Sequence, residues 1–155
     1  TKEFPEISVM AGTVIERDQV AEVQDAGALV AVSPNISIHI LEEASLKSMP
    51  FVPGVATPSE IGLGIELGLD TFKFFPAEMI GGMRYLKRVN APYAHKKVQF
   101  IPLGGLSEKL IPEYTVEDFV LALGGSWIAD KELIKMNDWE QITQNAINAR
   151  AKIAQ

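Results

Sequence analysis

The chain has 155 residues, of which 47% are hydrophobic and 22% are charged, a composition typical of one globular domain. Its net charge of -6 without a block of lysines or arginines argues against a nucleic-acid surface, and no apolar run approaches the roughly 18 residues that cross a bilayer. There is no cysteine, which excludes a disulfide framework, a thiolate metal site and a cysteine nucleophile, and fits a cytoplasmic protein.

Short apolar runs recur along the chain and predict β-strands. Their starts are 21, 22, 21, 26 and 21 residues apart, which fits one strand plus one helix with short loops. The runs are nearly continuous rather than alternating, as expected for parallel strands that are covered on both faces. The pattern therefore predicts an α/β fold with six strands within the ranges 7–14, 28–35, 50–56, 71–78, 97–105 and 118–127.

Helical patterns fill the segments between these runs. The clearest start signal is Thr57-Pro58-Ser59-Glu60, which predicts a capping box with Pro58 at the first helical position. The segment 107–116 contains Pro112 and predicts a short, broken connection. The other expected helices cover 16–26, 37–48, 82–89 and 139–154.

Two architectures accept this βα array: an open doubly wound sheet, or part of an eight-stranded (β/α)8 barrel. In both, ligands bind beyond the carboxyl ends of the strands. Small residues, hydroxyls and glycines follow the expected strands at these ends. The candidate site is therefore expected there.

One lysine stands among three phenylalanines in the run TFKFFPAE. Strand alternation places Phe72 and Phe74 on one face and Lys73 with Thr71 and Phe75 on the other. If the sheet curls into a barrel, the Lys73 amine points inward, and loss of water lowers its pKa and makes it a nucleophile. The alternative is a lysine near a strand end whose ammonium reaches solvent.

Two glycine pairs follow the last two expected strands. Residues without a Cβ let backbone N–H groups approach an anion, and in (β/α) barrels the corresponding loops frequently bind phosphate. Ser126 adds a hydroxyl. The alternative is that the glycines only shape tight turns. The pairs are Gly104-Gly105 and Gly124-Gly125.

No further catalytic set emerges. His39 and His95 are far apart and fit no metal-ligand spacing, so we expect surface or structural roles. Glu78 suits either an acid/base role or a helix cap, and Trp127 and Trp139 are expected to be packing residues. A GxGxxG dinucleotide fingerprint is absent, which argues against a nicotinamide site.

Several of these stretches together resemble the 2-keto-3-deoxy-6-phosphogluconate aldolase and 4-hydroxy-2-oxoglutarate aldolase family. The resemblance implies a (β/α)8 barrel of which about six βα units, family strands 3 to 8, lie within a single domain covering 1–155. It also implies class I aldolase chemistry without a metal or cofactor, and a homotrimer. The stretches are AGTV (11–14), AVSPN (31–35), PFVPGVATPSE (50–60), FKFFPAE (72–78) and LGGSW (123–127).

In this resemblance Lys73 matches the family's Schiff-base lysine. It implies attack on the ketone of the 2-keto acid and cleavage to pyruvate and an aldehyde, with the iminium as electron sink. Thr13 matches a threonine that contacts the keto acid, and Pro34 lies in the corresponding turn. The region that receives the phosphate end of the larger substrate matches Gly104, Gly105, Gly125 and Ser126.

The chain departs from the family pattern at two places. Leu103 stands where the family usually has a threonine before the glycine pair, which leaves open whether the preferred substrate is phosphorylated. The resemblance also implies that this chain lacks the family's initial helix and first two βα units, and with them the family's catalytic glutamate and a substrate-binding arginine. No residue here takes either role.

Two other hypotheses remain open from the sequence. One is a non-catalytic phosphate- or keto-acid-binding domain with an open doubly wound sheet, for which 155 residues is a natural length. The other is a catalytically inactive remnant that still binds such ligands. Motif order favours the aldolase.

Overall fold

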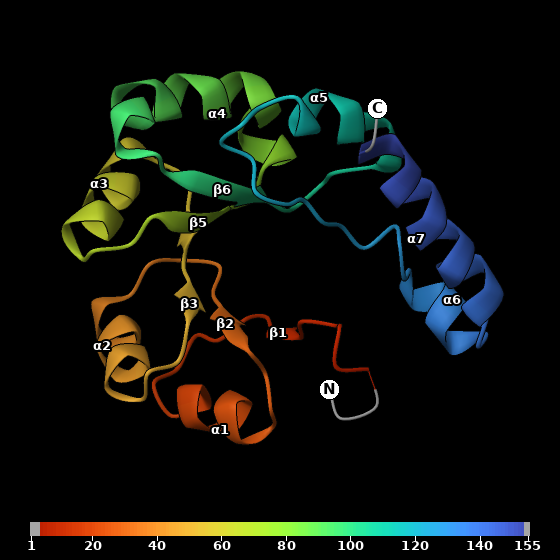
Figure 1. The fold of residues 1–155 in the computed structure, drawn as a ribbon, viewed down its shortest axis with the longest axis horizontal. Helices are drawn as coiled ribbons and strands as arrows, with labels where there is room; N and C mark the ends of the chain where they lie inside the picture. Colours follow the sequence, from red (N-terminus) through yellow and green to blue (C-terminus); the bar gives the residue numbers. More distant parts are fainter. Residues whose placement is uncertain (1–3, 154–155) are drawn as a thin grey trace. The chain divides into compact units, whose positions relative to one another are not determined.

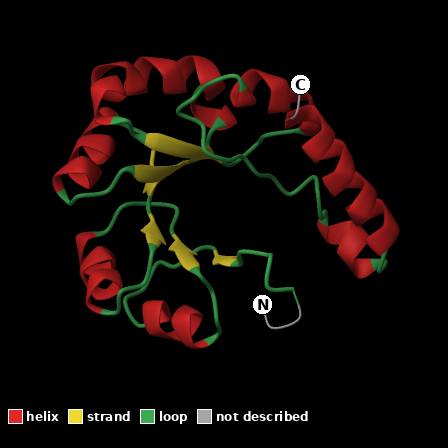
Figure 2. Cartoon of the chain, in the orientation of Figure 1, coloured by secondary structure: helices red, strands yellow, loops and turns green. Residues whose placement is uncertain are grey.

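The computed structural model describes residues 4–153, which form parallel strands alternating with helices (Figure 1). The chain divides into two compact units, residues 1–75 and 76–155, and each is described by itself. Helices make up most of the regular structure and the strands are short (Figure 2). The predicted α/β class is confirmed, whereas a single domain over 1–155 stays a prediction.

The first unit begins with a parallel three-stranded sheet. Its order is β1-β2-β3, with Met10 opposite Val30 and Ala31 opposite Phe51. The two crossovers are helices, as parallel neighbours require. The elements are β1 (Met10–Ala11), α1 (Gln19–Asp25), β2 (Val30–Val32), α2 (Ile38–Leu46) and β3 (Phe51–Val52).

An apolar cluster joins this sheet to its two helices. Val20 of α1 and Ile40 of α2 are buried against Ala31 of β2. Each helix thus turns an apolar face to the sheet and buries part of it. Other members of the cluster are Val14, Ala44 and Met49.

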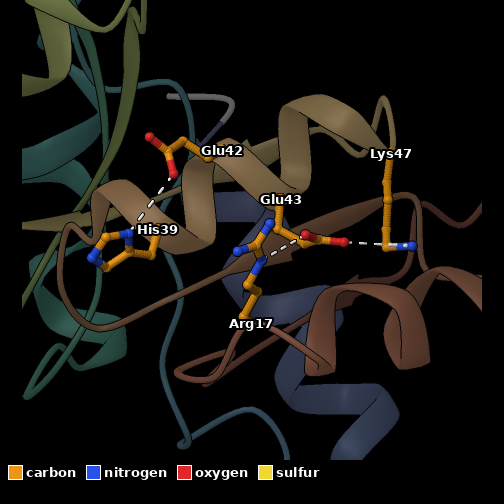
Figure 3. A network of polar contacts seen from close by, with 5 residues as sticks. All are labelled: Arg17, His39, Glu42, Glu43 and Lys47. Carbon is orange, nitrogen blue, oxygen red and sulfur yellow. Dashed lines mark hydrogen bonds and ion pairs between the residues drawn. The ribbon is translucent and has the colours of Figure 1, made fainter.

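A polar network on the surface links the loop before α1 to α2 (Figure 3). Arg17 Nε lies 2.7 Å from Glu43 Oε2, and Lys47 Nζ lies 3.5 Å from Glu43 Oε1. The hydrogen bond from Arg17 lowers the pKa of Glu43. His39 belongs to the same helix, and its side chain is 86% exposed, which confirms the expected surface position.

Pro53 divides the strand expected over 50–56 into β3 and β4 (Gly54–Val55). Proline has no N–H to donate to a ladder, so one continuous strand is interrupted there. Beyond the interruption, β4 pairs in parallel with β5 (Thr71–Phe74). The single strand predicted over 50–56 is therefore two strands in the structure, β3 and β4.

Helix α3 (Pro58–Glu66) connects β4 to β5 and begins as predicted. The Thr57 hydroxyl accepts from the Glu60 N–H, and Glu60 Oε2 accepts from the Thr57 N–H. This reciprocal pair is a capping box. Gly64 of α3 packs directly on the Phe72 ring, so the helix covers the Phe72 face of β5.

The second unit is mostly helical around one strand. Helix α4 follows a turn of 3-10 helix, and β6 follows a second such turn. The expected closing helix over 139–154 is present to Ile153, residue 154 lies outside the described residues, and Ala149 is its buried residue. The elements are η1 (Glu78–Ile80), α4 (Gly82–Asn90), η2 (Ala91–Lys96), β6 (Gln99–Pro102), η3 (Glu108–Leu110), α5 (Ile111–Thr115), α6 (Lys131–Lys135) and α7 (Trp139–Ile153).

The sixth expected strand, within 118–127, does not form as a strand. Phe100 and Val120 make one isolated parallel bridge, and residues 121–125 carry no ladder. Gly124 and Gly125 lack side chains that pack on a sheet face, which weakens a strand at this point. The structure thus has an extended connection where a full sixth βα unit was predicted.

The segment 107–116 is short and broken, as predicted: it divides into η3 and α5, and Pro112 lies in the first turn of α5, where a missing N–H costs no hydrogen bond. Helix α6 was not predicted; the Asp130 carboxylate caps it by accepting from the Glu132 N–H. Within residues 4–153 no helix is both long and apolar enough to cross a membrane.

Candidate functional site

Lys73 lies on the face of β5 that α3 does not cover. Phe72 and Phe74 on the opposite face are completely buried, whereas Lys73 is half-buried. Because Gly64 of α3 touches the Phe72 ring, the lysine side chain is directed away from that helix. The alternation predicted for TFKFF is confirmed.

Gly54 lies between Lys73 and Pro34. It is the parallel partner of Lys73 in the β4–β5 ladder, and the Lys73 N–H donates to the Pro53 carbonyl at 2.9 Å. On its other side, a Cβ added to Gly54 would meet the Pro34 carbonyl carbon and oxygen at 2.2 Å. The Pro34 turn and the Lys73 strand therefore approach each other across a residue that must be glycine.

The environment of Lys73 acts on its amine in two opposing ways. Burial lowers the pKa of Lys73 from its usual value of 10.5, which raises the fraction of neutral amine. The Nζ atom also lies 4.4 Å from the centroid of the Phe75 ring, a contact that favours the charged form. The lowered pKa indicates that desolvation is the stronger effect.

Thr13 follows β1 and adopts a left-handed backbone conformation with φ of 61°. This conformation is uncommon for a threonine, and such outliers gather at functional sites. The next residue, Val14, is buried and its N–H donates to the Val32 carbonyl at 3.0 Å. Thr13 is thus held at the carboxyl edge of the β1–β2 pair with its side chain exposed.

In the second unit, Gly104 and Gly105 follow β6 with φ values of 96° and 80°. A side chain at either position would be strained, so the turn itself requires glycine. The Ala77 N–H donates to the Leu103 carbonyl at 2.8 Å, and the Glu78 N–H donates to the Gly104 carbonyl at 3.0 Å. The N–H groups of Ala77 and Glu78 therefore hold the glycine turn from one side.

The second glycine pair lies beside the first. The Gly124 N–H donates to the Pro102 carbonyl at 3.4 Å, and a Cβ on Gly124 would lie 3.1 Å from Leu103 Cδ2. Gly125 is covered by the Trp127 ring, which confirms the predicted packing role of that tryptophan. Ser126 is exposed next to it. The two pairs expected at one edge of the fold are brought together within this unit.

Tyr114 is a residue that the sequence did not single out. It is completely buried in α5, and its hydroxyl donates to Glu78 Oε1. Glu78 therefore does not cap α4 with its side chain, and its carboxylate is held by a tyrosine 36 residues away. Nothing in the local sequence around Tyr114 signals this contact.

Residues 4–153 contain no cluster of three or more histidine, cysteine, aspartate or glutamate side chains able to hold a metal ion. His95 lies exposed in η2.

Comparison with known proteins shows the family of this chain. The family model described as KDPG and KHG aldolase matches residues 1–145. The chain belongs to the KDPG and KHG aldolase family. It is therefore an aldolase, an enzyme of the aldehyde-lyase class, and nothing favours the alternative of a non-catalytic binding domain.

Individual relatives agree with this assignment. The KHG/KDPG aldolase of Escherichia coli strain K12 is 40% identical over 148 residues, which cover 96% of this chain and 68% of that protein. A Legionella pneumophila KDPG aldolase structure, with pyruvate captured as a covalent carbinolamine intermediate, has a TM-score of 0.86 at 37% identity, covering 99% of this chain and 70% of that one. A Zymomonas mobilis KDPG aldolase structure with 3-phosphoglycerate has a TM-score of 0.85 at 37% identity. The match covers 96% of this chain and 68% of that one.

Proposed function

We propose that this aldolase is a class I enzyme in which Lys73 forms a Schiff base with a 2-keto acid. The observation that carries the proposal is the placement of Lys73: half-buried on the face of β5 away from α3, beside Gly54, with a pKa lowered by burial. A neutral amine at neutral pH is what attack on a ketone requires. Pyruvate captured as a covalent carbinolamine in the Legionella pneumophila relative supports the same chemistry.

In the proposed reaction, the neutral Lys73 amine adds to the C2 ketone, and the carbinolamine loses water to give an iminium. The C4 hydroxyl then loses its proton and becomes the carbonyl of the departing aldehyde, while the C3–C4 bond breaks and its electron pair flows into the iminium to leave an enamine. Protonation of the enamine at C3 and hydrolysis return pyruvate and the free amine. Thr13 and Pro34, held at the strand ends of the first unit, are the proposed contacts to the keto acid.

The proposed substrates are 2-keto-3-deoxy-6-phosphogluconate and 4-hydroxy-2-oxoglutarate. The glycine turns of the second unit supply the proposed phosphate-binding groups of the first substrate: Gly104, Gly105, Gly125 and Ser126. The 3-phosphoglycerate in the Zymomonas mobilis relative supports a ligand of this type. Leu103 is apolar at the edge of this region, and its neighbour Gly124 leaves room for it.

The remaining parts of the proposal rest on the family resemblance. They are a (β/α)8 barrel of which this chain forms a part, a homotrimer, a cytoplasmic location and the absence of a cofactor. Sedimentation velocity of the purified protein tests the trimer. A monomer at micromolar concentration would remove that part without touching the Schiff-base chemistry.

Borohydride trapping tests the central claim. The protein is incubated with pyruvate and sodium borohydride, and the intact mass and the peptide map locate any reduced adduct. We expect one pyruvate adduct on Lys73, and none in Lys73→Arg, which keeps the charge but supplies no amine of comparable nucleophilicity. Lys135→Arg on α6, an exposed lysine, is the matched control and should trap like the parent. Folded protein that gives no adduct at Lys73 would disprove the Schiff-base mechanism.

A further inference from the structure

The buried hydroxyl of Tyr114 connects three elements of the second unit. It donates to Glu78 Oε1 in η1 at 2.5 Å. The phenol oxygen of Tyr114 also interacts with the Met83 backbone amide at the start of α4. Burial and the bond to Glu78 raise the pKa of Tyr114, so the phenol stays protonated and remains a donor.

The main chain of Glu78 is tied to the glycine turn. Its N–H donates to the Gly104 carbonyl, and the preceding N–H of Ala77 donates to the Leu103 carbonyl. Both carbonyls of the turn are thus drawn toward the same short segment. Any shift of Glu78 would move them.

The direction of these carbonyls fixes the direction of two N–H groups. In a planar trans peptide the C=O and the following N–H point to opposite sides. Because the Leu103 and Gly104 carbonyls face Ala77 and Glu78, the N–H groups of Gly104 and Gly105 both face away from that segment. Within residues 4–153 neither N–H donates to a protein acceptor. Two successive free donors on one side form an anion-binding concavity.

The Glu78 side chain lies close to this turn. A Cβ on Gly105 would come within 2.9 Å of Glu78 Cβ, and a Cβ on Gly82 would come within 2.9 Å of Glu78 Oε1. The two N–H groups face away from this side chain, so a carboxylate released from Tyr114 would not take their hydrogen bonds, but its negative charge beside the turn would repel an incoming anion. The bond to Tyr114 keeps the carboxylate engaged elsewhere.

We propose that Glu78 and Tyr114 are positioning residues for the phosphate end of the substrate. Through its backbone Glu78 orients the Gly104 and Gly105 N–H groups, and Tyr114 binds the Glu78 carboxylate and so keeps its charge from repelling the phosphate. The ligand class is a phosphate monoester dianion. The inference rests on the proposed function for its substrate, but not on the chemistry at Lys73.

Inorganic phosphate titrated into the ¹⁵N-labelled full chain tests the proposal, with the amide shifts of Gly104 and Gly105 as the readout. In the parent protein both amides should shift on binding. Tyr114→Phe should weaken phosphate binding roughly five- to tenfold, the usual effect of losing one such hydrogen bond. Tyr93→Phe in η2, which also removes a phenol hydroxyl, is the matched control and should leave the affinity unchanged.

A double variant separates positioning from general structural damage. Adding Glu78→Gln to Tyr114→Phe removes the charge that Tyr114 had held, so phosphate affinity should recover most of the loss. A merely structural role predicts no recovery. If Tyr114→Phe does not fold, Glu78→Asp decides instead, because the shorter side chain breaks the same bond and keeps the buried tyrosine; the same weakening is expected.

Three results would overturn the inference: no shift of the two amides in the parent protein, an affinity in Tyr114→Phe or Glu78→Asp within twofold of the parent, or no recovery in the double variant. Borohydride trapping of pyruvate on Lys73 in the same samples reports separately on the proposed function. Loss of trapping in every sample, with phosphate binding still dependent on Tyr114, would remove the Schiff-base proposal and keep this one.

Discussion

Lys73 and Gly54 are parallel partners in the β4–β5 ladder, and the Pro34 carbonyl lies against the other side of Gly54. The distance from the Pro34 carbonyl carbon to a Cβ on Gly54 would be 2.2 Å, far below any contact that real side chains make. The clash is with backbone, which cannot rotate away as a side chain can. The position of Lys73 therefore depends on Gly54, a residue that has no side chain to take part in the reaction.

Gly54→Ala should separate the Pro34 turn from β4. We expect a loss of unfolding free energy of about 1–3 kcal/mol or more, as for overpacking of a well-packed core, and slower trapping of pyruvate on Lys73. Urea unfolding and trapping rates measure the two effects. Gly12→Ala is the control, since a Cβ there would meet nothing within 4 Å. Equal stability of the two variants would contradict this account of the strand.

The Phe75 ring opposes the effect of burial on Lys73, so its removal should lower the pKa of Lys73 further. For the parent protein we expect the trapping rate to rise with pH through a midpoint below 10.5. In Phe75→Leu the midpoint should move down by about half a pH unit, the equivalent of a cation–π contact of ~0.5–1 kcal/mol. The trapping rate as a function of pH measures it. Phe51→Leu is the control: Phe51 lies in β3 and packs against the apolar cluster of the first unit, so this change should leave the midpoint unchanged.

Glu43 should contribute to the acid sensitivity of the first unit. The hydrogen bond and charge of Arg17 hold the pKa of Glu43 below its usual value of 4.5, so the folded protein binds this proton less readily than the unfolded chain. The stabilisation is therefore present above about pH 4.5 and is lost as the pH falls through the lower, folded-state pKa. Urea unfolding at a series of pH values should show this loss in the parent protein and a flatter profile in Glu43→Gln. Glu22→Gln on α1 is the control, and should follow the parent.

The features that sequence predicted correctly are local ones. The capping box of Thr57 and Glu60 follows from residues three apart, and the facing of Lys73 follows from a period of two within one strand. The helix α7 follows from a repeated spacing over four turns. Each depends on neighbours along the chain, so no tertiary contact can reverse it easily.

The features that sequence did not predict depend on contacts between distant segments. The Tyr114–Glu78 bond joins residues 36 apart, and the approach of Pro34 to Gly54 joins the turn after β2 to strand β4. The run before Trp127 reads as a strand by composition, yet only Val120 makes a bridge there. Apolar composition indicates burial, whereas a strand also needs a partner along its whole length.

Leu103 allows a last prediction, about substrate choice. Its side chain lies against Gly124, and its carbonyl is already held by the Ala77 N–H, so a substitution changes the side chain without moving the turn. Leu103→Thr places a hydroxyl beside the two glycine pairs. We expect kcat/KM for 2-keto-3-deoxy-6-phosphogluconate to rise about fivefold relative to 4-hydroxy-2-oxoglutarate, the worth of one hydrogen bond. Leu103→Val removes similar apolar surface without a hydroxyl and should leave that ratio unchanged. If both variants change the ratio equally, the space vacated by leucine, and not the hydroxyl, sets the preference.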